Sequence, residues 1–242
     1  MRQQQLSGAS VKGEMVINSG RSDLRAEAGF SLLELVLAMA VTLVVMGMAS
    51  ALLAGSFNIR SRENQKSEAI ADVQRALNVM TREIANSGFG LTNNGIVAAD
   101  SGLSQIRFRA NLNAYRGQTT SDSVTDRDED VQYRLVSDAS TIYIMRLDVN
   151  TNNTTTVLAN RIDTFRIRYY ASKIDYTVGD CDIIAPAGVA EVAQKSSAGY
   201  IVITVCVTLP ARGRPSSPGY QPESKMQLVS DINLRNANLM QY

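Results

Sequence analysis

The longest apolar stretch of the chain lies close to its N-terminal end. It runs from residue 35 to residue 55, and Thr42 and Ser50 are the only polar side chains within it. A helix rises about 1.5 Å per residue, so this stretch would be about 31 Å long, which matches the hydrocarbon thickness of a bilayer. The pattern therefore predicts a helix that is able to span a membrane.

Beyond residue 55 the apolar positions keep a helical spacing while charged residues fill the places between them. The apolar positions that recur every three or four residues are Ile70, Val73, Leu77, Met80 and Ile84. No proline interrupts residues 30–87, and the segment 86–88 (NSG) is a typical helix end. We therefore expect one continuous helix from about residue 30 to about residue 87, amphipathic in its second half.

After residue 90 the spacing of apolar positions changes to two, which is the period of a half-buried β-strand. The alternating runs are 106–108, 131–135, 142–144, 165–169 and 201–207. The segment 148–154 (DVNTNNT) predicts a hairpin turn, because Asn and Asp tolerate left-handed backbone. The stretches 111–130, 171–199 and 209–225 predict loops.

Together these patterns predict an α+β protein in which the second half of a long N-terminal helix packs on an antiparallel β-sheet. We expect four parts. They are a leader (1–29), a membrane-spanning half of the helix (30–55), an amphipathic half (56–90) and an antiparallel β domain (91–242).

The composition narrows the chemistry that the chain can carry out. It contains no histidine, which is the commonest general base and the commonest metal ligand in proteins. Its two cysteines, Cys181 and Cys206, are too few for a zinc or iron–sulfur cluster. The formal net charge of +1 gives no global attraction to nucleic acid or anionic lipid. We expect a protein that is not an enzyme, needs no cofactor or metal, and does not bind nucleic acid.

A polar leader precedes the apolar stretch. Residues 1–29 carry four basic and three acidic side chains, and Met15 is an alternative start. The segment 29–36 (GFSLLELV) resembles the class III signal of type IV prepilins. In that family a dedicated peptidase cuts on the cytoplasmic side after the glycine and methylates the new N-terminal phenylalanine. The resemblance implies cleavage between Gly29 and Phe30, and N-methylation of Phe30.

Glu34 stands at the entrance to the apolar stretch. An ionisable side chain costs about 2.5 to 3.5 kcal/mol at the centre of a bilayer, so a carboxylate kept beside such a stretch normally has a function. In the prepilin family the glutamate at this place pairs with the positive amino terminus of a neighbouring subunit and sets the axial register of the filament. The resemblance implies this assembly role for Glu34 and the Phe30 amine.

Two other interpretations of the apolar stretch remain open on the residues alone. An ordinary secretory signal would use the small residues 49–51 (ASA) as its cleavage site, although its polar n-region would be unusually long. A simple single-pass anchor would leave Glu34 as a charge at the membrane interface. A plain anchor, however, predicts neither the Gly29-Phe30 junction nor the uninterrupted amphipathic extension of the helix.

Looser resemblances concern the rest of the chain. The segments 80–90 (MTREIANSGFG) and 162–170 (IDTFRIRYY), and the strand 201–209 with Arg212 after it, are similar to minor pilins of the PilW type. They imply a structural minor subunit that helps to assemble or prime a type IV pilus. The alternatives are a type II secretion pseudopilin of the J type, a membrane-anchored adhesin or binding protein, and a secreted enzyme.

The resemblance also implies a location and partners. It implies a single-pass protein of the inner membrane whose C-terminal domain is periplasmic and which enters a pilus or pilus-like filament. Its partners would be other pilins and minor pilins through the N-terminal helix, the prepilin peptidase, the inner-membrane assembly platform and membrane lipid. Because the periplasm is oxidising, a disulfide between Cys181 and Cys206 is expected, with two buried thiols as the alternative.

Two groups of charged residues beyond residue 100 are candidates for a ligand site. The acidic group 122–130 does not fit a calcium-binding EF-hand loop, because the loop's glycine and glutamate positions are held by Val131 and Ser137. We expect it to be a solvated loop. The second group consists of Arg107, Arg109, Arg161, Arg166 and Arg168. Its alternation predicts outward-facing charges on a sheet rather than a DNA-binding stripe.

Overall fold

The computed structural model of the chain describes residues 30–113, 124–138, 141–158 and 162–236. The expected leader with Gly29, and the expected site residues Asp122 and Arg161, lie outside these described residues. The chain divides into two compact units, residues 1–47 and residues 48–242. The long N-terminal helix contributes to both units, and each unit is described by itself.

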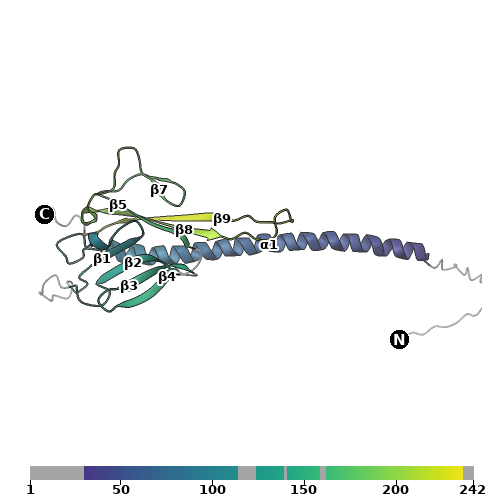
Figure 1. The fold of residues 1–242 in the computed structure, drawn as a ribbon, viewed down its shortest axis with the longest axis horizontal. Coiled ribbons are helices and arrows are strands. Elements are labelled where there is room, and N and C mark those ends of the chain that lie inside the picture. Colours follow the sequence, from purple (N-terminus) through teal and green to yellow (C-terminus); the bar gives the residue numbers. More distant parts are fainter. Residues whose placement is uncertain (1–29, 114–123, 139–140, 159–161, 237–242) are drawn as a thin grey trace, which may run out of the picture. The chain divides into compact units, whose positions relative to one another are not determined.

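The helix α1 comprises Leu32–Ala85 and is continuous over 54 residues (Figure 1). Its part in the first unit, from Leu32 to Gly47, is exposed throughout. In the second unit α1 buries a seam whose members are Gly55, Arg62, Gln65, Ala69, Val73, Ala76, Leu77, Met80, Ile84 and Ala85. Their spacing of three to four residues is that of one helix face. The prediction of one uninterrupted helix is confirmed, with each end two residues inside the expected boundary.

A turn ends the helix at Ala85 and leads the chain into the β strands. The amide of Ser87 donates to the carbonyl of Ile84 at 2.9 Å, and Gly88 has a φ of +78°. This left-handed conformation is the usual end of a helix, and glycine adopts it without a steric penalty. The amide of Gly88 then donates to the carbonyl of Arg109 at 2.9 Å, which fastens the turn to the first strand.

The strands form three antiparallel sheets. The first sheet has the order β1-β2-β3-β4, and its strands are β1 (Gln105–Arg109), β2 (Asp130–Ser137), β3 (Ile142–Asp148) and β4 (Asn153–Leu158). The second has the order β5-β8-β9, with β5 (Ile162–Tyr170), β8 (Tyr200–Leu209) and β9 (Ser224–Asn233). The third pairs β6 (Thr177–Val178) with β7 (Ile183–Ile184). Two short 3₁₀ helices, η1 (Ala98–Asp100) and η3 (Lys195–Ser197), complete the described elements.

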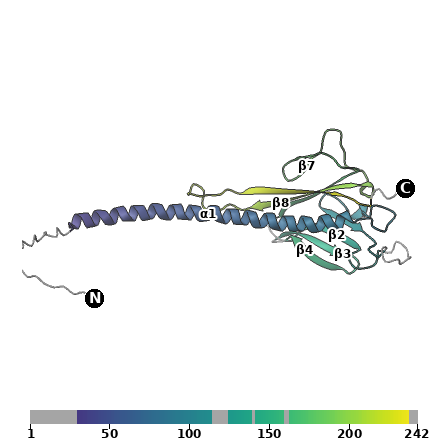
Figure 2. The same cartoon turned by 180° about the vertical axis from the view of Figure 1, so that it is seen from behind.

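The main core lies between α1 and the two larger sheets. Within the second unit, the helix runs between the β1–β4 sheet and the β5–β8–β9 sheet, as both views show (Figures 1 and 2). Val73, Met80 and Ile84 of α1 pack there with Tyr133 and Phe165, and all five side chains are at most 1% exposed. The amphipathic half of the helix is thus stabilised by burying its apolar seam against both sheets.

Strand β8 is buried on both faces. Ile201, Ile203 and Val205 face the main core, whereas Val202 packs on the other face in a second cluster with Tyr200. The residues between β5 and β8, which include β6 and β7, cover this second face. A strand covered on both faces is apolar at nearly every position, and β8 has this composition.

The fold class is therefore α+β, as predicted, but the β domain differs in three respects from the expected single sheet. The strands divide into three sheets, β6 and β7 lie inside the expected loop 171–199, and β9 begins at Ser224 within the expected loop 209–225. The expected hairpin at 148–154 is present between β3 and β4, with a left-handed residue at Asn152 (φ +54°). The strand β9 does not alternate in burial, because five of its ten side chains are half-buried, four are exposed and only one is buried.

Candidate functional site

The first half of α1 exposes the largest apolar surface of the described residues. Phe30, Leu32 and Leu33 are 77–83% exposed, and large apolar side chains remain exposed along the helix as far as Ile59. Among the described residues, this is the one helix long and apolar enough to cross a membrane. An exposed apolar surface of this length requires lipid or other apolar helices around it.

Glu34 lies in the first turn of α1 and is exposed. A carboxylate in this position is favoured by the positive end of the helix dipole. The helix begins with the amide of Leu35 donating to the carbonyl of Ser31 at 3.1 Å, so Phe30 and Ser31 precede the helix. No basic group among the described residues pairs with Glu34. A cationic partner for its carboxylate would have to come from elsewhere.

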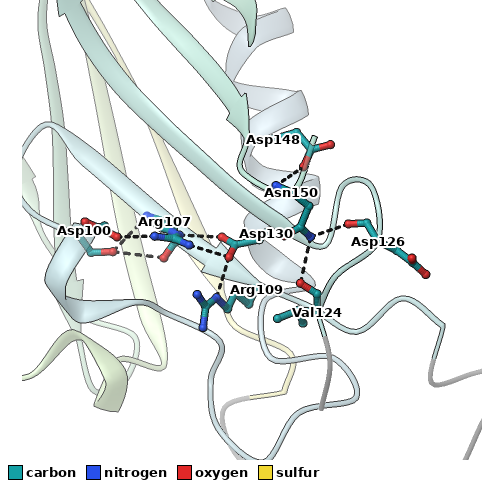
Figure 3. Close-up of polar contacts among 9 residues, drawn as sticks. Asp100, Arg107, Arg109, Val124, Asp126, Asp130, Asp148 and Asn150 are labelled. Carbon is teal, nitrogen blue, oxygen red and sulfur yellow. Dashed lines mark hydrogen bonds and ion pairs between the residues drawn. The ribbon is translucent and has the colours of Figure 1, made fainter. Parts of the chain in front are cut away.

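The acidic segment that leads into β2 is only in part the solvated loop that we expected, because Asp126 is exposed whereas Glu129 and Asp130 are buried. Asp130 is 3% exposed, and Arg107 donates to it from Nε at 2.7 Å and from Nη2 at 2.8 Å. Arg109 donates to the same carboxylate from Nε at 2.8 Å, and Arg107 also reaches Asp100 (Figure 3). Glu129 is buried as well and accepts the amides of Leu112 and Asp126. The expectation was wrong for Glu129 and Asp130, because the sequence shows these charges but not their partners.

This network predicts a loss of stability in acid. Burial alone would raise the pKa of Asp130, but the hydrogen bonds from Arg107 and Arg109 outweigh it and hold the pKa below the usual range of a carboxyl group. A carboxyl group whose pKa is lower in the folded state than in the unfolded state stabilises the fold. This contribution is fully present at a pH above the unfolded pKa of about 3.9, and it is lost as the pH falls through the folded pKa.

We therefore expect the free energy of unfolding to be constant at neutral pH and to fall below about pH 4. The Asp130→Asn variant should be less stable at neutral pH by about 2 kcal/mol and should show a shallower acid decline. Urea unfolding of the detergent-solubilised chain across pH measures both effects. Asp175→Asn, at an exposed position, is the control. Equal acid slopes for wild type and Asp130→Asn would contradict the assignment.

The hairpin turn after β3 is organised by a second buried carboxylate. Asp148 is 1% exposed and accepts hydrogen bonds from the Asn150 amide, the Thr151 hydroxyl and the Asp128 amide. Asn150 in turn donates through Nδ2 to the carbonyls of Val124 and Asp126 (Figure 3). The oxygens that could have suggested a cation site therefore accept donors of the chain and hold the turn.

A third network fastens the C-terminal end of α1 to the first sheet. Glu83 accepts from the Tyr133 hydroxyl at 2.7 Å and from Nε of Arg146 at 2.9 Å, and Arg146 also pairs with Asp128 at 2.7 Å. Glu83, Arg146 and Asp128 border a cavity of about 300 Å³ whose apolar wall includes Phe108. Sequence reasoning placed Glu83 on the solvated face of the helix. Its partners lie 50 and 63 residues further along the chain, and no local pattern indicates them.

Of the two described arginines of β5, Arg168 is held in ion pairs, whereas Arg166 has no ion pair with the described residues. Arg168 donates to Asp182 through Nε at 3.2 Å and to Glu191 through Nη1 at 2.7 Å. The arginines of β1 and β5 alternate with buried apolar residues, so they face away from the core as expected. Arg107, Arg109 and Arg168 are in addition held in ion pairs at half-buried positions.

A disulfide joins Cys181 to Cys206, with the two Cα atoms 5.4 Å apart. Cys206 lies on the face of β8 away from the main core and is fully buried. Cys181 has a φ of +55°, and its amide donates to the side chain of Gln227 in β9 at 3.0 Å. The bridge ties the β5–β8 connection to the middle strand of its sheet.

Two comparisons with known proteins gave a match, one to a sequence motif and one to a solved structure. Residues 24–50 match the family model of the prokaryotic N-terminal methylation motif. A type IV-like pilin from Thermus thermophilus is similar in structure, with a TM-score of 0.42 and 12% sequence identity over 70% of this chain and 98% of that chain. No curated protein matches the chain.

The matched segment contains Phe30, Glu34 and the start of the exposed apolar helix. The chain thus combines a prokaryotic N-terminal methylation motif with a long apolar helix, and antiparallel sheets pack on the second half of that helix.

Proposed function

We propose that this chain is a structural subunit of a type IV pilus or a related filament, and within that class a minor pilin of the PilW type that takes part in assembly or priming. The observation that carries the proposal is the exposed apolar half of α1, whose first residues belong to a methylation motif. A single chain leaves this surface uncovered, whereas lipid covers it before assembly and neighbouring helices cover it in a filament.

The proposal assigns a role to each part of the chain. Residues 1–29 are the leader, which the prepilin peptidase removes before N-methylation of Phe30. Residues 30–55 anchor the subunit in the inner membrane and later pack in the filament core, where Glu34 pairs with the Phe30 amine of a neighbour. Residues 56–90 join this segment to the domain 91–242 on the periplasmic side. The partners are other pilins, the peptidase, the inner-membrane assembly platform and membrane lipid.

Recovery of the chain from filaments tests this function. A minor subunit is expected in sheared, washed filaments at a small fraction of the amount of the major subunit, and deletion of its gene is expected to reduce filament number. Quantitative immunoblotting of sheared and membrane fractions measures the first quantity, and electron microscopy measures the second. A chain that stays in the membrane fraction while filaments form at normal numbers would contradict the proposal.

A further inference from the structure

The connection between β8 and β9 packs against α1 at the residue where the apolar stretch ends. Gly55 is buried there, and a Cβ placed on Gly219 would lie 2.4 Å from the Gly55 Cα. A Cβ on Gly55 would lie 3.2 Å from the Pro218 carbonyl oxygen, and Gly219 has a φ of +76°. The two backbones are therefore in direct contact, which requires glycine at 219 and leaves little room for a side chain at 55.

A buried arginine of the helix fixes this connection at both of its ends. Arg62 is 6% exposed, and its guanidinium donates to the carbonyl of Pro210 at 2.5 Å and to the carbonyl of Pro222 at 2.9 Å. It also donates to the hydroxyl of Ser224 at 2.6 Å. The segment 210–223 is thus held along the helix from Arg62 to Gly55 rather than projecting freely (Figure 1).

This region of the second unit is strongly basic. Residues 56–66 and 210–225 together carry six basic and two acidic side chains, although residues 30–242 as a whole carry 20 of each. We name the exposed members of this set the basic collar. They are Arg60, Lys66, Arg212, Arg214 and Lys225, of which Lys225 pairs with Asp163. Among the described residues, Arg60 and Arg214 have no ion-pair partner.

The collar lies at the depth of lipid headgroups if the apolar stretch fills the hydrocarbon layer. Arg60 is five residues beyond Gly55, or about 7.5 Å along a helix, and each headgroup layer is about 5 to 8 Å thick. Phe57 and Ile59 in the same turn are 67% and 49% exposed, and Tyr220 lies in the connection. Aromatic and apolar side chains interleaved with cations are typical of a membrane–water interface.

We propose that the basic collar binds the anionic headgroups of the leaflet at which α1 leaves the membrane. This inference rests on the proposed insertion of residues 30–55. The collar follows the span in the chain and so lies on the side opposite the leader, whereas basic residues that orient a span gather on the cytoplasmic side. The collar is therefore not needed as an orientation signal. Each of its cations that lies near an anionic lipid surface adds to the attraction between the protein and that surface.

The test is lipid selectivity around the full-length chain. The chain is reconstituted in phosphatidylcholine bilayers, and spin-labelled phosphatidylglycerol or phosphatidylcholine is added as a probe. Electron spin resonance then measures the motionally restricted fraction of each probe. We expect about a threefold preference for the anionic probe, lost at about 1 M salt, where the Debye length is about 3 Å. The double variant Arg60→Gln/Arg214→Gln should lose it too, and Arg134→Gln/Arg235→Gln, exposed arginines elsewhere in the second unit, should keep it.

The outcomes separate this inference from the proposed function. If neither probe shows a restricted fraction, the chain is not inserted and the proposed function fails. If both probes are restricted equally, the chain is inserted but the collar does not bind anionic lipid, and this inference is overturned. If both probes are restricted equally and filaments contain fewer Arg60→Gln/Arg214→Gln subunits than wild-type subunits, the collar would instead bind an acidic surface of a neighbouring subunit.

Discussion

Replacing Glu34 by leucine is expected to leave the chain in the membrane but to remove it from filaments. The substitution takes an ionisable group away from the start of the apolar helix, which lowers the cost of insertion. It also removes the carboxylate that, in the proposed function, pairs with the Phe30 amine of a neighbouring subunit. A pair shielded from water contributes more than an exposed one, so incorporation should fall at least tenfold, which corresponds to about 1.4 kcal/mol.

The comparison needs variants that separate charge from hydrophobicity. Glu34→Gln keeps the shape and removes the charge, so it should fail in assembly like Glu34→Leu. Glu68→Leu changes an exposed acid on the same helix beyond the apolar stretch and should assemble normally. Membrane flotation measures insertion, and immunoblots of sheared filaments measure assembly. Wild-type incorporation of Glu34→Leu would make Glu34 an interfacial charge without an assembly role.

Removing the disulfide is expected to destabilise the β domain by about 3.5 kcal/mol, the chain-entropy estimate for a bridge of this span. The bridge closes a loop between residues 25 apart in the sequence, and this constraint restricts the unfolded chain more than the folded one. The double variant Cys181→Ala/Cys206→Ala avoids a lone reactive thiol. Urea unfolding of the detergent-solubilised chain, with and without reductant, measures the difference.

The internal control for this prediction is the response to reductant. The wild-type chain should lose stability when reduced, whereas the double-alanine variant should not respond. Processing at Phe30 and membrane insertion should be unaffected, because both depend on the N-terminal segment. Two alkylatable thiols in the native chain, or a loss of stability under about 1 kcal/mol, would contradict a stabilising bridge.

The long helix could be predicted from the sequence because its signals are local. The apolar stretch, the three-to-four spacing around Val73 and Met80 and the absence of proline all lie within the helix itself. Strand β5 could be predicted for the same reason, since it alternates clearly. Strand β8 was predicted too, although it is buried on both faces rather than half-buried. Strand β9 was missed, because it lies at the edge of its sheet and only one of its ten side chains is buried.

The polar networks could not be predicted, because they depend on long-range pairing. Glu83 meets Arg146 across 63 residues, and Asp130 meets Arg107 across 23. In the sequence each of these residues looks like an ordinary surface charge. For the candidate site, the sequence identified the exposed apolar helix from its composition. The roles of Gly29, Phe30 and Glu34 depend on a resemblance, and Gly29 lies outside the described part of the chain.

The central claim is that the apolar helix is retained on the processed protein and begins at Phe30. The most direct test is mass spectrometry of the N-terminal peptide of the chain purified from membranes or filaments. The account predicts a peptide that starts with N-methylated Phe30 and that disappears, with accumulation of the uncut chain, when the prepilin peptidase is absent. A protein that begins near Ser50, after loss of the apolar stretch, or one that keeps residues before Phe30 in a strain with an active peptidase, would contradict it.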